Sequence, residues 1–316
     1  MKLLRNAAIA GALVLMLAIS GVWLFGGSYA IRAVLRHGGF FWIKMQADDP
    51  RLSASIRTAL REPPPVTAGP LEWRQVRTGF EVAELPVIAG DGEVDRILLA
   101  RVDPALFRFE VHHSPSGERD LDQWMTQLGA ALVINGSFFS RHGMPVTPVI
   151  SAGTRLGPKE YDAKAGAFVA SAGFVGVRDL AREDWHAAFR DADNAMVSFP
   201  LLVSQDAPRR ITPSRWLANR SFVGQDRNGW IILGTTSDAF FSLDRLGEFL
   251  RQAPLGLVLA LNLDGGPVAC QGIALDGFER KTYGRWEIQA QGDKVQLLTW
   301  PYGTIEMPIV LAVFPR

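Results

Sequence analysis

The chain is poor in cysteine and histidine. Its 316 residues include one cysteine, Cys270, and five histidines. A single cysteine excludes an intrachain disulfide framework and a cysteine-rich zinc site. The histidines lack the HExxH spacing of a helical zinc site. These absences leave only carboxylate sites for calcium or magnesium open, and we expect no metal and no cofactor.

An excess of charge of either sign is also lacking. Lys and Arg number 33 against 32 Asp and Glu, so the formal net charge is +1. Nucleic-acid-binding domains usually carry a basic patch or stripe, and this chain has neither, so nucleic acid is not an expected partner. Hydrophobic residues make up 48% of the chain, which is enough for a full core and excludes disorder over most of its length.

One long hydrophobic run is present, at Ala7–Phe25, preceded by Lys2 and Arg5. An uncharged run of this length predicts a transmembrane helix in the lipid bilayer, with its positive flank in the cytoplasm. A cleaved signal peptide is the alternative, because Ser28-Tyr29-Ala30 offers a cleavage site. Either interpretation puts the rest of the chain outside the cytoplasm, in the bacterial periplasm if anchored or secreted if cleaved.

Composition divides the remaining chain in two. A short helix is expected from Asp49 to Leu60, followed by the stiff spacer Glu62-Pro63-Pro64-Pro65. We therefore expect a membrane anchor or signal segment at 1–30, a juxtamembrane helix and Pro-rich linker at 31–70, and one domain at 71–316.

In that domain the sequence predicts many short strands and two helices with clear capping signals. Alternating strands surround Asp103-Pro104, and Asn228-Gly229 is typical of a hairpin. The fold class expected is α+β, with mixed, mostly antiparallel sheets and a few flanking helices, as a single domain behind an N-terminal transmembrane helix.

Two helix–strand units end in polar residues and glycine. A helix capped by Asp120 precedes the strand Ala130–Ile134, which leads into Asn135-Gly136-Ser137. A second helix, capped by Ser242, precedes the strand Leu257–Leu261, which leads into Asn262-Leu263-Asp264-Gly265-Gly266. Ligands collect beyond the carboxyl ends of strands in sheet-and-helix folds, so we expect these two strand ends to meet at one cleft.

Three segments together resemble the phosphodiester glycosidase family. They are VINGSFF (133–139), ANRSFVGQDRNGWIIL (218–233) and LALNLDGG (259–266). The resemblance extends over roughly Arg96 to Cys270. It implies hydrolysis of the bond that joins a sugar's anomeric carbon to a phosphodiester, or of a related cell-envelope glycan linkage. A carbohydrate or sugar phosphate is then the expected partner.

The resemblance also implies roles for individual residues. Asp264 would activate water or stabilise oxocarbenium character, and Arg220 would hold the phosphate through its planar, permanently charged fork. Asn135 would complete the catalytic set by holding the sugar. The remaining expected substrate-binding residues are Gly136, Ser137, Asn262, Gly265, Gly266 and His142.

The chain departs from the family pattern at two places. Ser137 stands where the family usually has glycine, and Pro267 and Val268 stand where it usually has Gly-Ser. The second departure removes a flexible, hydroxyl-bearing loop. It favours the alternative that the chain is a catalytically inactive glycan-binding or envelope-assembly protein on the same fold. A third hypothesis uses Cys270 as a nucleophile.

Some residues have a simpler interpretation. Arg220 would pair with a surface carboxylate such as Asp226, as exposed arginines commonly do. Phe138 and Phe139 would be core residues rather than a platform for a sugar.

Overall fold

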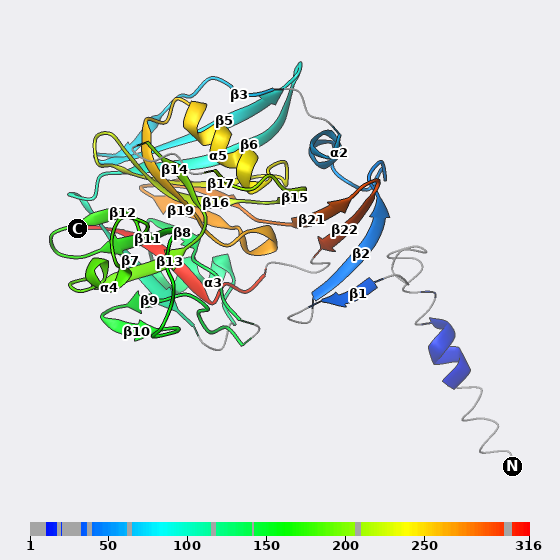
Figure 1. The fold of residues 1–316 in the computed structure, drawn as a ribbon, viewed down its shortest axis with the longest axis horizontal. Helices are drawn as coiled ribbons and strands as arrows, with labels where there is room; N and C mark the ends of the chain where they lie inside the picture. The colour runs from blue at the N-terminus through cyan, green and yellow to red at the C-terminus, as the bar shows by residue number, and fades with distance from the viewer. Residues whose placement is uncertain are drawn as a thin grey trace, which may run out of the picture.

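The computed structural model describes residues 11–17, 20, 33–36, 40–61, 65–114, 118–140, 142–205, 210–299 and 305–316. Within these ranges the chain is built from four sheets with a few short helices (Figure 1). All the strand pairs described are antiparallel, as in β5·β6 and β16·β17. The sheets and flanking helices therefore confirm the expected fold class, apart from its transmembrane helix.

The largest sheet has the order β14 (Leu201–Ser204), β18 (Leu257–Asn262), β16 (Ser221–Asp226), β17 (Ile231–Thr236), β6 (Gly92–Val102), β5 (Phe80–Ala89) and β3 (Val66–Ala68), with β4 (Arg74–Arg77) also on β5. A second sheet has the order β20 (Phe278–Thr282), β19 (Gln271–Leu275), β8 (Leu132–Asn135), β23 (Ile309–Pro315) and β7 (Phe107–His113).

The third sheet runs β1 (Ala33–Arg36), β2 (Phe40–Gln46), β22 (Lys294–Thr299), β21 (Trp286–Gln291) and β15 (Trp216–Ala218). The fourth runs β10 (Thr154–Leu156), β9 (Val149–Ser151), β13 (Asn194–Ser198), β11 (Gly166–Ala170) and β12 (Val175–Asp179). The helices are α2 (Ala54–Leu60), α3 (Leu121–Leu128), α4 (Trp185–Ala188) and α5 (Leu243–Gln252), with the 3₁₀ turn η2 at Gly266–Val268.

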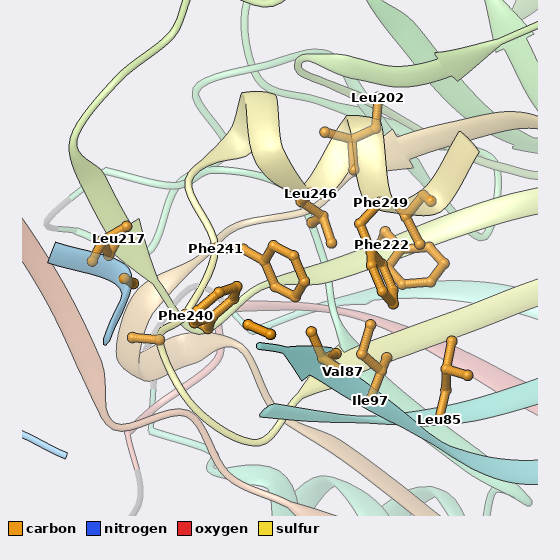
Figure 2. Packing of buried hydrophobic residues seen from close by; sticks show 14 of the residues in the cluster. Leu85, Val87, Ile97, Leu202, Leu217, Phe222, Phe240, Phe241, Leu246 and Phe249 are labelled. Carbon is orange, nitrogen blue, oxygen red and sulfur yellow. The ribbon is translucent and has the colours of Figure 1, made fainter. Parts of the chain in front are cut away.

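The central strands β16 and β17 of the largest sheet are buried on both faces, since successive side chains of a strand point to opposite faces and nearly all of theirs are buried. In β16, Phe222 packs with Leu246 of α5, whereas the next residue, Val223, packs with Leu132 of β8. Figure 2 shows the first of these layers, in which α5 lies over the strands that carry Phe222 and Ile97. The order of layers is thus α5, the largest sheet, the second sheet, and α3.

The two helices expected from capping signals are present. Asp120 caps α3, with its carboxylate accepting from the Gln123 N–H in a capping box, and Gly129 ends the helix in the left-handed conformation. Ser242 is the N-cap residue of α5, although its hydroxyl makes no capping bond. The helix expected from Asp49 is shorter than the sequence suggests, since Ser53 caps it and the helix begins at Ala54.

The segment before residue 71 takes part in the fold. Strand β2 pairs with β22, so residues 40–46 extend the same sheet that carries β21. The arginines at 215 and 245 donate to the carbonyls of Leu60 and Ala59 at the end of α2. The boundary expected at residue 70 stays a prediction, but residues 40–60 are tied to the domain by these contacts.

Most of the hydrophobic run Ala7–Phe25 lies outside the described residues. Residues 11–17 are helical, and their large apolar side chains, such as Leu15, are exposed. In the part of the chain that the structure describes, no helix has the length and apolar character needed to cross a bilayer. The transmembrane helix stays a prediction.

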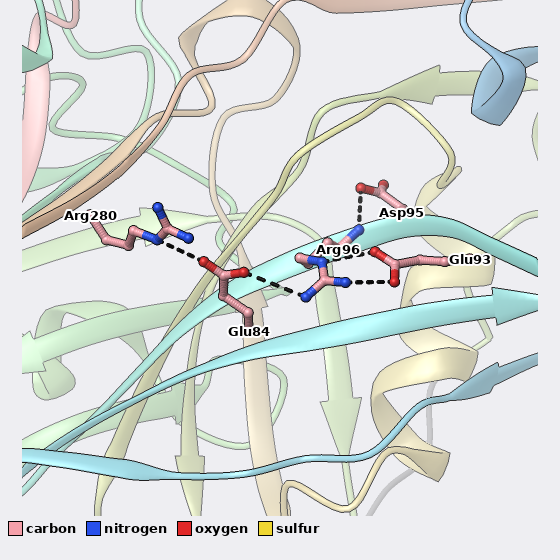
Figure 3. Close-up of polar contacts among 5 residues, drawn as sticks. All are labelled: Glu84, Glu93, Asp95, Arg96 and Arg280. Carbon is pink, nitrogen blue, oxygen red and sulfur yellow. Dashed lines mark hydrogen bonds and ion pairs between the residues drawn. The ribbon is translucent and has the colours of Figure 1, made fainter.

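A chain of ion pairs crosses the surface from β20 to β6 (Figure 3). Arg280 donates to Glu84 at 2.8 Å, and Glu84 in turn lies 3.5 Å from Arg96, which also pairs with Glu93 at 2.6 Å. These side chains are a third or more exposed, and ion pairs of that kind add little stability. Asp95 differs, because it is buried and its Oδ1 accepts from the backbone N–H groups of Arg96 and Asp238.

We expect Phe222→Ala to lower the free energy of unfolding by about 3–5 kcal/mol, because it leaves a cavity between α5 and the largest sheet. Phe222 is fully buried. The matched control is Leu106→Ala, an apolar residue that is 43% exposed and should change stability by less than about 0.5 kcal/mol. Urea denaturation of the purified chain measures both. Equal effects of the two variants would contradict this account of the core.

Candidate active site at the Asp264 turn

The two strand ends expected to meet do meet, although they belong to different sheets. Asn135 ends β8, and its Nδ2 donates to the Asp264 carbonyl at 2.8 Å. Its Oδ1 accepts from the Cys270 N–H at 3.3 Å, so one side chain holds both ends of the loop 264–270. The Asp264 N–H donates to the Gly136 carbonyl at 3.0 Å. Asn135 thus positions the loop, and its side-chain atoms are engaged by protein backbone.

The residues after Asn135 are packed tightly. A Cβ on Gly136 would lie 2.5 Å from Cγ2 of Ile309, so only glycine fits beside β23. Ser137 is buried, and its hydroxyl bonds to that of Thr147 at 3.1 Å. Gly136 therefore serves close packing, and the Ser137 hydroxyl is used within the protein. These contacts give neither residue a side chain that faces a ligand.

Arg220 is a buried cation, and it lies just before β16. Its Nε donates to the Phe241 carbonyl at 3.2 Å and its Nη2 to the Trp216 carbonyl at 2.8 Å. The carboxylate suggested by the sequence, Asp226, pairs with Arg101 at 2.7 Å instead. Within the described residues no carboxylate oxygen lies within 4 Å of the Arg220 guanidinium.

Burial lowers the pKa of Arg220 to about 10, while the nearby negative charges of Glu287, Asp264 and Asp244 act to raise it. The guanidinium is therefore still charged at neutral pH. It is a cation held by neutral carbonyl groups with carboxylates nearby, and its Nη1 lies beside the glycine turn.

The surroundings of the turn explain why Gly265 and Gly266 are both glycine. A Cβ on Gly265 would lie 3.0 Å from Nη1 of Arg220, and a Cβ on Gly266 would lie 2.8 Å from Oε2 of Glu287. Gly266 also has a φ of 75°, which other residues rarely adopt. The two glycines let the backbone pass between a cation and a carboxylate.

Glu287 is the residue that sequence reasoning missed. It belongs to β21 of the third sheet, and its Oε1 accepts from Nε1 of Trp216 at 2.7 Å. The carbonyl of the same tryptophan accepts a hydrogen bond from Nη2 of Arg220, so Trp216 links the two charged residues. In the sequence, Trp286–Gln291 reads as an ordinary strand with polar side chains, and no local signal sets Glu287 apart.

Asp264 lies within this charged cluster. Its side chain is partly buried, and its Oδ1 accepts from the Gly265 N–H at 2.9 Å. Burial and the neighbouring Glu287 charge raise the pKa of Asp264 to about 8, against the lowering effects of the Gly265 N–H and Arg220. At neutral pH Asp264 thus keeps its proton.

Asn262 lies at the end of β18, on the side of the turn away from Arg220. Its Nδ2 donates to the Phe199 carbonyl at 2.9 Å, and its buried Oδ1 has no hydrogen-bond partner among the described residues. The ring of Phe199 stacks on that of Phe138, with centroids 4.3 Å apart. Asn262 therefore keeps an unused acceptor next to an aromatic pair.

Two other candidates lie apart from this cluster. His142 is exposed in the loop that follows Phe139, and its backbone N–H donates to the Ser140 hydroxyl. Cys270 is buried, and burial raises the pKa of its thiol to about 12, so the nucleophilic thiolate is scarce at neutral pH. In the described ranges no group of three or more His, Cys, Asp and Glu side chains is arranged to hold a metal ion.

Comparison with known families agrees with the sequence resemblance. The model of the phosphodiester glycosidase family matches residues 128–269, which confirms the resemblance and includes Asn135, Arg220 and Asp264. Glu287 lies beyond the matched residues. A comparison with curated proteins finds no match to this chain.

Two solved structures share the fold. The catalytic domain of zebrafish N-acetylglucosamine-1-phosphodiester alpha-N-acetylglucosaminidase, auto-inhibited by its pro-peptide, is 15% identical, with a TM-score of 0.52. The match covers 86% of this chain and 88% of that one. A hypothetical protein from Synechocystis is 17% identical, with a TM-score of 0.50 over 78% of this chain. This chain spans 64% of the Synechocystis protein. At these identities the likeness establishes the fold alone.

The raised pKa of Asp264 predicts the sign of a pH effect on stability. Unfolded, Asp264 loses its proton near pH 3.8; folded, it keeps it to about pH 8. In that range the folded state binds more protons, so the free energy of unfolding falls as pH rises. We expect Asp264→Asn to remove this decline, and thus to stabilise the protein at pH 8 more than at pH 5, as measured by urea denaturation.

The control for this prediction is Asp276→Asn. Its ion pair with Arg77 lowers the pKa of Asp276, so that carboxylate is ionised in both states from pH 5 to 8. The substitution should leave the pH dependence in that range unchanged. An Asp264→Asn variant whose stability runs parallel to the wild type from pH 5 to 8 would show that Asp264 is ionised in the folded protein.

Proposed function

We propose that the chain is a glycosidase that hydrolyses the bond between a sugar's anomeric carbon and a phosphodiester. The observation that carries this proposal is the cluster of two carboxyl groups, Asp264 and Glu287, beside the buried cation Arg220. A carboxyl pair is the machinery of most glycosidases, and a buried arginine suits a phosphate. The family match over residues 128–269 supports the same reaction class.

Arg220 is suited to hold the phosphate of the substrate. Two of its nitrogens are fixed by the carbonyls of Phe241 and Trp216, which orient the guanidinium and leave Nη1 beside Gly265. A cation buried among neutral acceptors gains when an anion binds next to it. The guanidinium would thus position the phosphodiester and stabilise the negative charge that grows on it as the glycosidic bond breaks.

The two carboxyl groups then divide the proton transfers. Glu287 would take a proton from the attacking water as the water oxygen bonds to the anomeric carbon. The bond from that carbon to the phosphate oxygen breaks, and the phosphate leaves with the electron pair. Asp264 would transfer its proton to the departing phosphate oxygen. A carboxyl group whose environment raises its pKa, as at Asp264, and that lies near a second carboxyl group is a usual sign of such a division.

The departure from the family pattern leaves this arrangement intact. Pro267 and Val268 are buried in the turn η2, directly after Gly266, and Pro267 occupies an early position of that turn where its missing N–H costs nothing. The Pro267 carbonyl accepts from the Cys270 thiol at 3.6 Å. These residues are buried and pack within the protein, so their identity does not argue for an inactive protein.

We further propose that the domain acts outside the cytoplasm, held at the membrane by Ala7–Phe25. The support is the sequence itself, which combines an uncharged run of bilayer length with Lys2 and Arg5 before it.

We expect Glu287→Gln and Asp264→Asn each to lower kcat/KM about 10²–10⁴-fold, since each removes one proton-transfer group. Arg220→Lys should cost about 10²–10³-fold, because an ammonium cannot reproduce the fork. The assay is release of the free sugar from sugar 1-phosphodiesters carrying different sugars.

Matched controls are Glu279→Gln and Arg280→Lys, whose side chains are 66% and 57% exposed and which should retain full activity. A wild-type protein without turnover on any such substrate, or a Glu287→Gln variant of unchanged activity, would reject the mechanism. The first of these results favours the binding-protein alternative.

The compartment is tested by fractionation of bacterial cells that express the full chain. An uncleaved anchor predicts a membrane fraction that resists alkaline washing and a mass that retains Ala7–Phe25, with the domain open to external protease in spheroplasts. A shorter, freely soluble periplasmic product indicates signal cleavage. Recovery of the whole chain from the cytoplasm would refute the proposed location.

A further inference from the structure

Where Phe199 and Pro200 accept hydrogen bonds from Asn262, these two residues also line a cavity that the reaction described above does not use. It has a volume of about 530 Å³ and is lined by residues 161–165, 197–201 and 210–212. This volume falls within the range of small-molecule sites. We propose that the cavity is a second sugar subsite, which receives the next unit of a glycan chain attached to the sugar that is cleaved. The inference rests on the proposed function.

The order of strands places the cavity on the glycosyl side of the reaction. Strand β18, which leads to Asp264, lies between β16 and β14. Arg220 precedes β16, and the Leu263 N–H donates to the Ser221 carbonyl at 2.9 Å. On the other side, the Asn262 N–H donates to the carbonyl of Pro200, just before β14, at 3.1 Å. The Asp264 turn therefore stands between Arg220 and the cavity.

The direction of the substrate follows from this arrangement. With the phosphate at Arg220 and the bond to be broken at Asp264, the sugar extends toward Asn262 and Phe199. A glycan that continues beyond this first sugar enters the cavity at Phe199, which is one of its lining residues. A single sugar would end at Asn262 and leave the cavity to water.

The lining of the cavity has the chemistry of a sugar site. The ring of Phe199 is 41% exposed although it stacks on Phe138, so part of its surface is open to the apolar face of a sugar. Ser198, also in the lining, is fully buried, yet its hydroxyl has no hydrogen-bond partner within the described residues. A buried hydroxyl without a partner is unfavourable, and rotation of the Ser198 side chain about χ1 toward the cavity would let a sugar hydroxyl satisfy it.

The charges of the lining do not favour a purely ionic ligand. Lys164 pairs with Asp162 at 2.6 Å, and both side chains are 76% exposed, so they lie at the rim and largely cancel. Arg210 is also exposed. The buried groups of the lining are apolar or hydroxyl-bearing, as in Val197 and Ser198. A neutral, hydroxyl-rich ring fits this surface better than a phosphate or a lipid chain.

Calorimetry of the purified full-length chain in detergent tests the proposal without relying on turnover. The probes are free hexoses, N-acetylhexosamines and uronic acids, each as the monosaccharide and as its disaccharides. We expect at least one disaccharide to bind about tenfold more tightly than its own monosaccharide, a gain in keeping with one stacked ring and a hydrogen bond. Phe199→Ala and Ser198→Ala should each reduce that gain, and Ser198→Ala should leave monosaccharide binding unchanged.

Two controls separate binding from folding. Leu106→Ala removes an apolar side chain of similar exposure elsewhere, and the gain should persist in it. Ser198→Ala removes a buried hydroxyl that lacks a partner, so this variant should be at least as stable as the wild type while it binds disaccharides less tightly. The proposal is overturned if no disaccharide binds more tightly than its monosaccharide, or if the gain survives both cavity substitutions.

Failure of the subsite is distinguishable from failure of the proposed reaction. Turnover of sugar 1-phosphodiesters with no gain for any disaccharide removes the subsite and keeps the glycosidase. A disaccharide gain that depends on Phe199, in a protein without turnover, keeps the subsite and removes the glycosidase.

Discussion

The structure depends on the hydrogen bonds that join the ends of β8 and β18. These strands belong to different sheets, and the Asn135 side chain bonds to backbone at both ends of the loop 264–270. A buried amide that uses its donor and its acceptor in this way fixes one loop geometry, because leaving either group unpaired is costly. The position of Asp264 against Arg220 follows from this junction. The glycine at 136 then lets β23 approach closely enough to close it.

Charge at the site is arranged by burial as much as by pairing. Arg220 donates to carbonyl groups, and the charges of Glu287, Asp264 and Asp244 act on it from nearby. Asp264 and Glu287 lie close enough for like charge to raise the pKa of Asp264. Burial of these ionisable groups therefore carries a free-energy cost. Functional sites commonly contain such unfavourable arrangements, and the stability of the rest of the fold offsets their cost.

The third sheet gives the N-terminal segment a part in the site. Strand β21 carries Glu287, and the same sheet includes β2 at residues 40–46, pairing through β22. Residues that follow the hydrophobic run are therefore built into the sheet that presents a proposed catalytic carboxylate. An enzyme held at a membrane would in this way have its site joined to the anchored segment by a sheet rather than by a free linker.

The sequence by itself determined the local structure and half of the site. Capping residues located α3 and α5, and the Asn-Gly pair located the turn between β16 and β17. The polar ends of two strands indicated Asn135 and Asp264, and the family resemblance indicated Arg220. These are signals of short range. Tertiary structure decided that the Asn135 and Ser137 side chains bond within the protein, that Asp226 pairs with Arg101, and that Glu287 joins Asp264. Glu287 comes from a strand of another sheet, and long-range packing of this kind leaves no pattern in the neighbouring residues.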